Sequence, residues 1–124
     1  MSNSQSQSQY LTRSIPNLQE LWENVWTEPL KLKVIKFGAD WCGPCRKVEP
    51  HYHELIQKND FSASFFTVDL TDKDDENAWE VFKVVGGKKL PYFVFFKDHQ
   101  RHESIQTSNI DIIEKITKKH LTKK

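Results

Sequence analysis

Long hydrophobic runs and an excess of one charge are both absent from this sequence of 124 residues. The longest strongly apolar run is Phe93–Phe96, far short of the roughly 18 residues that a membrane-spanning helix needs. Lysine and arginine together number 18, and aspartate and glutamate 17, so the net charge is only +1. A chain this close to neutral has no general attraction to nucleic acid or to an anionic membrane. The composition therefore predicts neither a nucleic-acid-binding protein nor a membrane protein.

An apolar leader segment is also missing at the N-terminal end. Residues 1–9 are rich in serine and glutamine, and they are too polar to offset the entropy lost on ordering. We expect a disordered tail over residues 1–9, followed by a single domain over residues 10–124. Because no signal-peptide pattern is visible, the simplest expectation for localisation is the cytoplasm, where thiols are kept reduced.

The hydrophobic fraction is 37%, and it includes 8 phenylalanines, 4 tryptophans and 3 tyrosines. They provide enough apolar surface for one packed core. A first helix is predicted from Asn17, its N-cap, with Glu20 three residues on. Its apolar face repeats at helical spacing: Leu18, Leu21, Trp22, Val25 and Trp26. Pro29 is expected to end this helix.

Strand-like runs alternate with helix-like runs along the rest of the chain. The predicted strands cover residues 10–15 (a short edge strand), 32–37, 61–70, 93–97 and about 103–106. The last two are joined by a short turn at Asp98–His99, so they must be antiparallel. Ser108 and Asp111 form a capping-box pattern that opens a final helix. This order predicts an α/β protein with three α/β/α layers and a central mixed sheet.

The only two cysteines, Cys42 and Cys45, stand in a Cys-x-x-Cys spacing between strand 32–37 and a helix-like run. Cys45 begins the apolar stripe of that helix and should be the more buried of the two. Cys42 lies at the helix N-terminus and is expected to point at solvent. Strand, tight turn, two thiols and helix together predict a dithiol/disulfide switch at a helix N-terminus.

Two other interpretations of the cysteines stay open. They could be ordinary buried thiols, although a solvent-facing helix start is a poor place for inert cysteines. Zinc needs two further ligands, and the candidates His51 and His53 lie on the same helix. His53 is roughly 12 Å from Cys45 along the axis. Bonds of about 2.0–2.3 Å cannot span that distance to a single ion, so no metal is expected.

The stretch Trp41-Cys42-Gly43-Pro44-Cys45 resembles the active-site motif of the thioredoxin family, as do Pro50 and the pair Leu90-Pro91. The order of elements resembles the thioredoxin fold over residues 10–122. The resemblance implies a thiol–disulfide oxidoreductase, specifically a protein disulfide reductase that is monomeric and requires no cofactor. Its implied partners are protein disulfide substrates and a thioredoxin-reductase-like electron donor. Its implied roles are electron transport and cell redox homeostasis.

The same resemblance implies a role for each residue of the motif. Cys42 would attack the substrate disulfide, and Cys45 would resolve the mixed disulfide. Trp41 would shield the site and pack against substrate, and Gly43-Pro44 would set the turn that presents the thiols. At Leu90-Pro91, the proline would be cis beside the disulfide, and the leucine backbone would pair with an extended substrate chain.

Lys36 departs from the family pattern, because most members have a buried aspartate at this position, and Thr67 stands where many have a lysine. Two interpretations of Lys36 stay open. Its ammonium could snorkel to the surface. Alternatively it could lie under the dithiol and tune ionisation of the thiols, as a cation that stabilises a thiolate or, if neutral, as a base. The loop before Pro91 is also longer than usual, and Gln106 or Thr107 replaces a common glycine, so partner choice is open.

Two alternative functions remain beside the reductase. Because of Lys36, the chain could be an oxidase or isomerase variant. It could also be a thioredoxin-fold interaction module that binds proteins through a flat Trp41/Pro91 surface, with incidental redox activity.

The other charged residues near these features are expected to be solvated: Arg46, Lys47, Lys88 and Lys89. Three histidines are expected at the surface: His99, His102 and His120.

Overall fold

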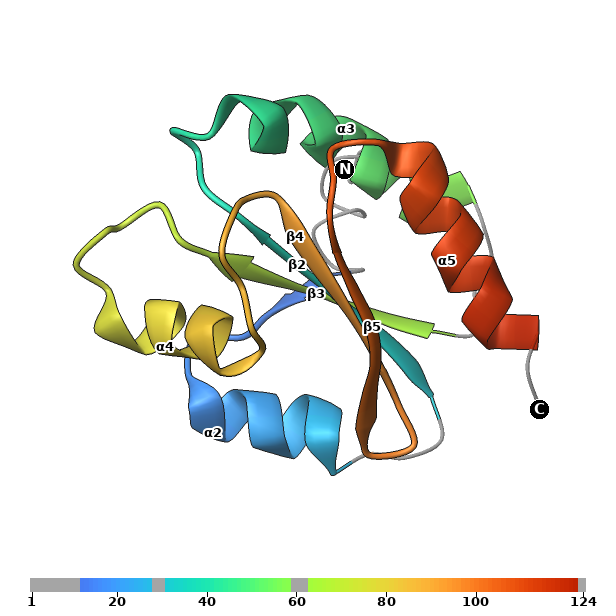
Figure 1. Ribbon diagram of the computed structural model, residues 1–124, viewed down its shortest axis with the longest axis horizontal. Helices are drawn as coiled ribbons and strands as arrows, with labels where there is room; N and C mark the ends of the chain where they lie inside the picture. Colours follow the sequence, from blue (N-terminus) through green and yellow to red (C-terminus); the bar gives the residue numbers. More distant parts are fainter. Residues whose placement is uncertain (1–11, 28–30, 59–62, 123–124) are drawn as a thin grey trace, which may run out of the picture.

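The computed structural model describes residues 12–27, 31–58 and 63–122 of the chain. Within them lies a five-stranded sheet in the order β1-β3-β2-β4-β5 (Figure 1). The strands are β1 (Thr12–Ser14), β2 (Leu32–Gly38), β3 (Ala63–Asp69), β4 (Tyr92–Lys97) and β5 (Gln100–Gln106). β1, β3 and β2 are parallel neighbours, whereas β4 is antiparallel to both β2 and β5. The mixed sheet predicted from the order of elements is confirmed.

Helices cover both faces of this sheet. α3 (Gly43–Lys58) and α5 (Ile110–Thr122) lie on one face (Figure 1). The other face is covered by α4 (Glu76–Val84) and by α2 (Leu18–Leu21), which continues into a π-helical segment over Trp22–Trp26. The three-layer α/β/α arrangement is therefore confirmed. Within the described ranges, every helix is too short or too polar to span a membrane.

The central strand β2 is buried at every residue, because helices cover both of its faces. Leu32 and Val34 belong to the apolar cluster of α3 and α5, whereas Ile35 and Phe37 belong to that of α2 and α4. This alternation follows from the two-residue period of a strand. By the same period, Lys36 faces α3.

The first helix begins as predicted but does not continue as predicted. Asn17 is the N-cap, and its Oδ1 accepts a hydrogen bond of 2.9 Å from the backbone N–H of Glu20. From Trp22 the helix widens into π-helical geometry, which moves side chains off a stripe with 3.6-residue spacing. Val25 within this segment is buried, whereas Trp22 is 57% exposed and stacks on Trp26, so the predicted place of Trp22 on the buried face is wrong.

Two boundaries near the C-terminal end differ from the predictions. β5 begins at Gln100, earlier than expected, because both residues of the turn Asp98–His99 adopt positive φ and close a tight hairpin. α5 is capped by Asn109 and not by Ser108, since Asn109 Oδ1 accepts a hydrogen bond of 3.0 Å from the N–H of Asp111. The expected tail over 1–9, the helix end at Pro29 and the strand start at 61–62 lie outside the described residues.

His120 is buried, which contradicts its expected place at the surface. It is only 5% exposed, its ring stacks on Phe95, and its Nε2 lies 3.0 Å from Glu103 Oε1. A buried imidazole is tolerated when its polar atoms have partners, and Glu103 on β5 supplies one. His99 and His102 are exposed, as predicted.

Glu103 also attaches α5 to β5 through a second residue, because Lys119 Nζ lies 3.0 Å from Glu103 Oε1. Burial opposes ionisation of this carboxyl, but hydrogen bonds from Lys119 and His120 outweigh it and lower the pKa of Glu103. A carboxyl with a lowered pKa in the folded state stabilises the fold above its ordinary pKa near 4.5. That stabilisation is lost as the pH falls through the lowered pKa.

Glu103→Gln is therefore expected to reduce the free energy of unfolding by about 1 kcal/mol at neutral pH, and by less as the pH falls. Urea unfolding at a series of pH values checks this. The matched control is Glu114→Gln, which breaks an exposed pair with Lys118 on α5 (2.9 Å) and should cost at most a few tenths of a kcal/mol. A Glu103→Gln loss that stays constant down to acidic pH would contradict this account.

Candidate active site

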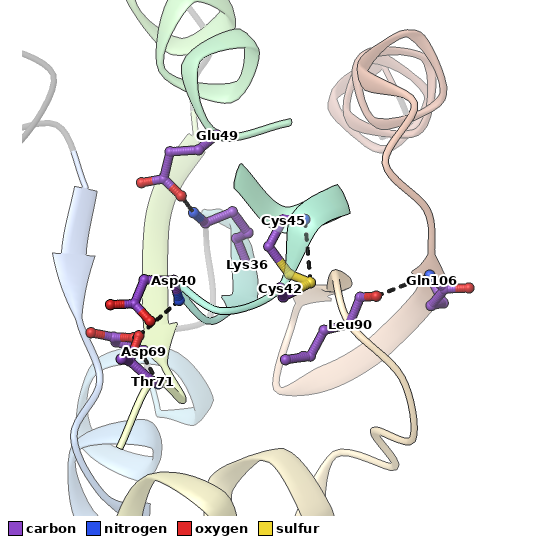
Figure 2. The surroundings of a disulfide bond; sticks show 9 residues. All are labelled: Lys36, Asp40, Cys42, Cys45, Glu49, Asp69, Thr71, Leu90 and Gln106. Atoms are coloured by element: carbon purple, nitrogen blue, oxygen red, sulfur yellow. Dashed lines mark hydrogen bonds and ion pairs between the residues drawn. A yellow bond between two sulfur atoms is a disulfide. The ribbon is translucent and has the colours of Figure 1, made fainter. Parts of the chain in front are cut away.

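The two cysteines are joined by a disulfide where β2 passes into α3 (Figure 2). Their Cα atoms are 5.2 Å apart, and Gly43 and Pro44 between them form the start of the helix. The carbonyl of Cys42 accepts a hydrogen bond of 3.1 Å from the N–H of Arg46, which makes Cys42 the N-cap residue. The N–H of Cys45 donates to Cys42 Sγ at 3.3 Å. A thiolate on Cys42 would therefore meet a backbone donor at the positive end of the helix dipole.

Both cysteines are less accessible than the sequence suggested. Cys45 is 3% exposed and is the more buried of the two, as predicted. Cys42 is only 9% exposed, so the expectation that it points freely at solvent is wrong. It belongs to an apolar cluster with Ala39 and Tyr92, and Leu90 packs against that cluster.

The loop ahead of the cysteines is tied to the end of β3. The N–H of Asp40 donates to Thr71 Oγ1 at 2.9 Å, and that hydroxyl donates to Asp69 at 2.5 Å. The indole N–H of Trp41 donates to the Thr71 carbonyl at 2.8 Å, and Lys73 Nζ lies 4.6 Å from the indole ring centroid. Trp41 is 46% exposed. These contacts fix the orientation of a large aromatic surface beside the disulfide.

The segment Leu90-Pro91 lies near the disulfide on the opposite side from Asp40 (Figure 2). Its peptide bond is cis, the isomer that the resemblance implied, and Pro91 is buried. The carbonyl of Leu90 accepts a hydrogen bond of 3.3 Å from Gln106 Nε2, and the carbonyl of Pro91 accepts one of 3.2 Å from the N–H of Thr107. Gln106 therefore contacts the backbone that is expected to meet substrate.

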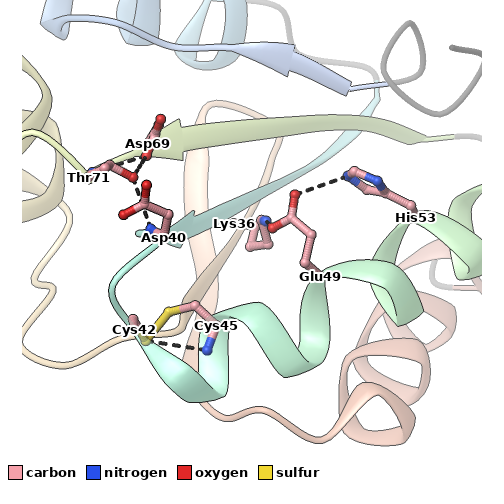
Figure 3. Close-up of polar contacts among 8 residues, drawn as sticks. All are labelled: Lys36, Asp40, Cys42, Cys45, Glu49, His53, Asp69 and Thr71. Carbon is pink, nitrogen blue, oxygen red and sulfur yellow. Dashed lines mark hydrogen bonds and ion pairs between the residues drawn. A yellow bond between two sulfur atoms is a disulfide. The ribbon is translucent and has the colours of Figure 1, made fainter. Parts of the chain in front are cut away.

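Lys36 does not snorkel to the surface, since it is 3% exposed. Its ammonium forms an ion pair with Glu49 Oε1 on α3 and lies 5.6 Å from the ring centroid of Tyr52. The second oxygen of Glu49 lies 3.5 Å from His53 Nε2 (Figure 3). Burial lowers the pKa of His53, Glu49 opposes this and Lys36 adds to it. The lowered pKa leaves His53 largely neutral at pH 7, so Lys36 is the cationic partner of Glu49.

Lys36, Glu49 and Cys45 line one cleft of about 440 Å³ beneath the first turn of α3. Its remaining walls come from the loop after β2 and from β3: Gly38, Ala39, Asp40, Arg46, Pro50, Thr67, Asp69 and Thr71. The interpretation that Lys36 lies near the thiols is therefore favoured over the surface interpretation. Arg46, Lys47, Lys88 and Lys89 are exposed, as predicted.

Glu49 is the residue of this site that sequence reasoning missed, because the helical pattern placed it away from the apolar stripe. Two signals in the sequence point to it. A charged residue inside the buried run 32–37 requires a counter-ion, and Glu49 follows Cys45 by four residues, one turn along the same helix. Among the described residues, no group of three or more histidine, cysteine, aspartate and glutamate side chains is arranged to hold a metal ion.

Known proteins resemble this chain along most of its length. The sequence model of the Thioredoxin family matches residues 13–119. Thioredoxin H4 of Arabidopsis thaliana is 34% identical over 104 residues, covering 78% of this chain and 83% of that protein. The thioredoxin of Gallus gallus is 28% identical over 108 residues, covering 87% and 97% respectively. Mitochondrial thioredoxin 3 of Saccharomyces cerevisiae, solved in its oxidised form, has a TM-score of 0.76 at 28% identity, covering 90% and 98%.

Removing the anion and removing the cation of the Lys36–Glu49 pair are expected to lower the free energy of unfolding by different amounts. Glu49→Ala leaves the buried ammonium of Lys36 without its anion and should lower the free energy of unfolding by about 2 kcal/mol. Lys36→Met leaves Glu49 half exposed to water and should stay within about 1 kcal/mol of wild type. Urea unfolding measures both. Glu54→Ala, at an exposed position of α3, is the control for loss of a carboxylate. Equal losses for Glu49→Ala and Lys36→Met would contradict this prediction.

Proposed function

Because the chain belongs to the thioredoxin family and is a thiol–disulfide oxidoreductase, we propose that it reduces protein disulfides. In this proposal Cys42 is the attacking nucleophile and Cys45 the resolving cysteine. The observation that carries the assignment is the difference between them: Cys42 is the N-cap of α3 and is 9% exposed, whereas Cys45 lies inside the first helical turn and is 3% exposed. A nucleophile must reach an incoming sulfur, and the resolving thiol must not compete for it.

The reaction proceeds in two exchanges. The Cys42 thiolate attacks one sulfur of the substrate disulfide, and the other substrate sulfur leaves as a thiolate. Cys45 then attacks Cys42 Sγ, which forms the Cys42–Cys45 disulfide and releases the second substrate sulfur. Two electrons pass from the dithiol to the substrate. Because the two cysteines are three residues apart with Cα atoms 5.2 Å from each other, the second exchange is intramolecular and fast.

The substrate surface in this proposal consists of Trp41 on one side of the disulfide and Leu90-Pro91 on the other. Trp41 offers an exposed indole whose N–H is already used by Thr71, so it contacts substrate through its ring. The Leu90 carbonyl has one lone pair engaged by Gln106 and a second that an extended substrate chain can use. Gly43-Pro44 shape the turn that presents the sulfurs.

The remaining assignments extend the family resemblance. We place the protein in the cytoplasm as a monomer that serves electron transport and cell redox homeostasis. A thioredoxin-reductase-like donor would return electrons to its disulfide. An oxidase or isomerase role is the second candidate, because Lys36 lies in the cleft of Cys45 and a cation there stabilises the reduced thiolate form. The neutralising partner Glu49 reduces that effect and favours the reductase.

Insulin reduction driven by dithiothreitol tests the proposal. Wild-type protein should accelerate precipitation of the insulin B chain, and Cys42→Ser should abolish the acceleration because no nucleophile remains. Cys45→Ser, reduced beforehand and mixed with insulin after dithiothreitol is removed, should attack once and accumulate as a mixed disulfide, visible as a covalent adduct by mass spectrometry. An inactive wild type would instead favour a thioredoxin-fold interaction module. A reduction potential measured against glutathione separates reductase from oxidase.

A further inference from the structure

The cleft beneath the dithiol contains an ion pair that the attack by Cys42 does not use. Glu49 follows Cys45 on α3 by one turn, roughly 6 Å along the axis and on the same face. Lys36 and Gly38 share the face of β2 that meets this turn, because they are two residues apart. A Cβ atom added to Gly38 would lie 3.6 Å from Cys45 Sγ. Lys36 is thus one strand repeat along β2 from the residue that meets the sulfur, and Lys36 and Cys45 line one cleft.

Resolution of the mixed disulfide makes a demand on this cleft. Cys45 becomes a nucleophile only after its thiol has lost a proton. At 3% exposure it has almost no direct contact with bulk water, so the proton needs an acceptor inside the cleft. A cleft of about 440 Å³ has room for several water molecules, each of which occupies about 30 Å³, so the acceptor can act through water.

The groups that face this cleft or Glu49 can be compared as acceptors. The titratable and charged ones are Lys36 from β2, Asp69 from β3, Asp40 from the loop, and Arg46, Glu49, Tyr52 and His53 from α3. Burial, and secondarily Glu49, raises the pKa of Tyr52 far above neutrality, so its hydroxyl stays protonated. Asp69 Oδ1 already accepts hydrogen bonds from the N–H and hydroxyl of Thr71. Glu49 is the carboxylate that is paired with a buried cation and shares a helix face with Cys45.

We propose that Glu49 accepts the proton of Cys45 during resolution and that Lys36 then becomes the counter-ion of the Cys45 thiolate. This proposal rests on the proposed function above. Before the transfer the cleft holds a neutral thiol, an ammonium and a carboxylate. Afterwards it holds a thiolate, an ammonium and a neutral acid. Its net charge is the same in both states, so no uncompensated charge is created in a buried place.

In the exchange that follows, one sulfur–sulfur bond forms and one breaks. The Cys45 thiolate bonds to Cys42 Sγ, the bond from Cys42 to the substrate breaks, and its electron pair leaves on the substrate sulfur. Glu49 is 46% exposed, so the protonated acid can pass its proton to solvent. When a donor later reduces the Cys42–Cys45 disulfide, Glu49 returns a proton to Cys45 along the same route.

A stoichiometric aryl disulfide with a coloured thiolate leaving group separates the two exchanges in one rapid-mixing experiment. Attack by Cys42 on the reduced protein releases the first coloured thiolate, and resolution by Cys45 releases the second. In Glu49→Gln, which keeps an oxygen for Lys36 but removes the base, the first phase should stay within about twofold of wild type. The second should slow about 10- to 100-fold at pH 7 and recover as the pH rises.

Controls separate a proton role from a structural one. Glu54→Gln removes an exposed carboxylate from the same helix and should match wild type in both phases. Asp40→Asn removes the other candidate carboxylate of the cleft and should not reproduce the pH-dependent slowing of the second phase. Glu49→Asp retains a carboxylate and should restore much of the second phase. If Glu49→Gln folds poorly, the double variant Lys36→Met/Glu49→Gln removes both charges of the pair and leaves no unpaired cation. Its second phase should still be slow.

A second phase at the wild-type rate in Glu49→Gln would overturn the proposal. So would a slowing by the same factor at every pH, or a pH-dependent slowing in Asp40→Asn in place of Glu49→Gln. Absence of the first phase in wild type would overturn the proposed function itself, and the proton role with it. The two failures are distinguishable because each phase reports a different cysteine.

Discussion

The central strand β2 is covered by helices on both faces, and a cation buried in such a strand must be neutralised within the fold. For Lys36 the anion comes from Glu49, one turn beyond Cys45 on the helix that begins at the disulfide. The pair joins α3 to β2 next to the point where Cys45 on α3 meets Gly38 on β2. The position of the resolving sulfur therefore depends on an electrostatic contact as well as on the apolar stripe of α3.

The two ends of this arrangement separate two chemical tasks. At the outer end, the start of α3 stabilises negative charge on Cys42, while the hydrogen bonds of Trp41 and of Leu90 fix the surfaces that flank it. At the inner end, a cleft with a charge pair lies against Cys45. In the proposed mechanism, attack needs access to substrate and resolution needs a place for a proton, and the same helix turn would serve both.

The fold could be predicted from the sequence because its signals are local and periodic. The strand at residues 32–37, the burial of Cys45 at the start of α3 and the cap at Asn17 each depend on residues close in the chain, and the structure has all three. The errors arise where a distant partner decides the outcome. His120 is buried because Glu103 and Phe95, both on other elements, receive it. Cys42 is less exposed than expected, and it belongs to an apolar cluster that includes residues far along the chain, such as Tyr92.

The candidate site was predictable to the same extent. The motif Trp41-Cys42-Gly43-Pro44-Cys45 predicted the candidate reactive pair, which the structure joins in a disulfide, and the charge at Lys36 marked where this chain departs from the family pattern. A helical wheel could not show that Glu49 meets that charge, because the contact depends on how α3 is placed over β2. The widening of the first helix at Trp22 is likewise invisible to a pattern with a period of 3.6 residues.

In the proposed mechanism, Cys45 and Glu49 exchange one proton across the cleft. Carbon NMR of the reduced protein, following the Cys45 β-carbon and the Glu49 carboxyl carbon over a pH series, tests it most directly. Coupled groups share macroscopic transitions, so both carbons should report the same two titration steps, and Glu49→Gln should leave Cys45 with one. Independent titration of the two carbons, with Cys45 unchanged by Glu49→Gln, would contradict the account.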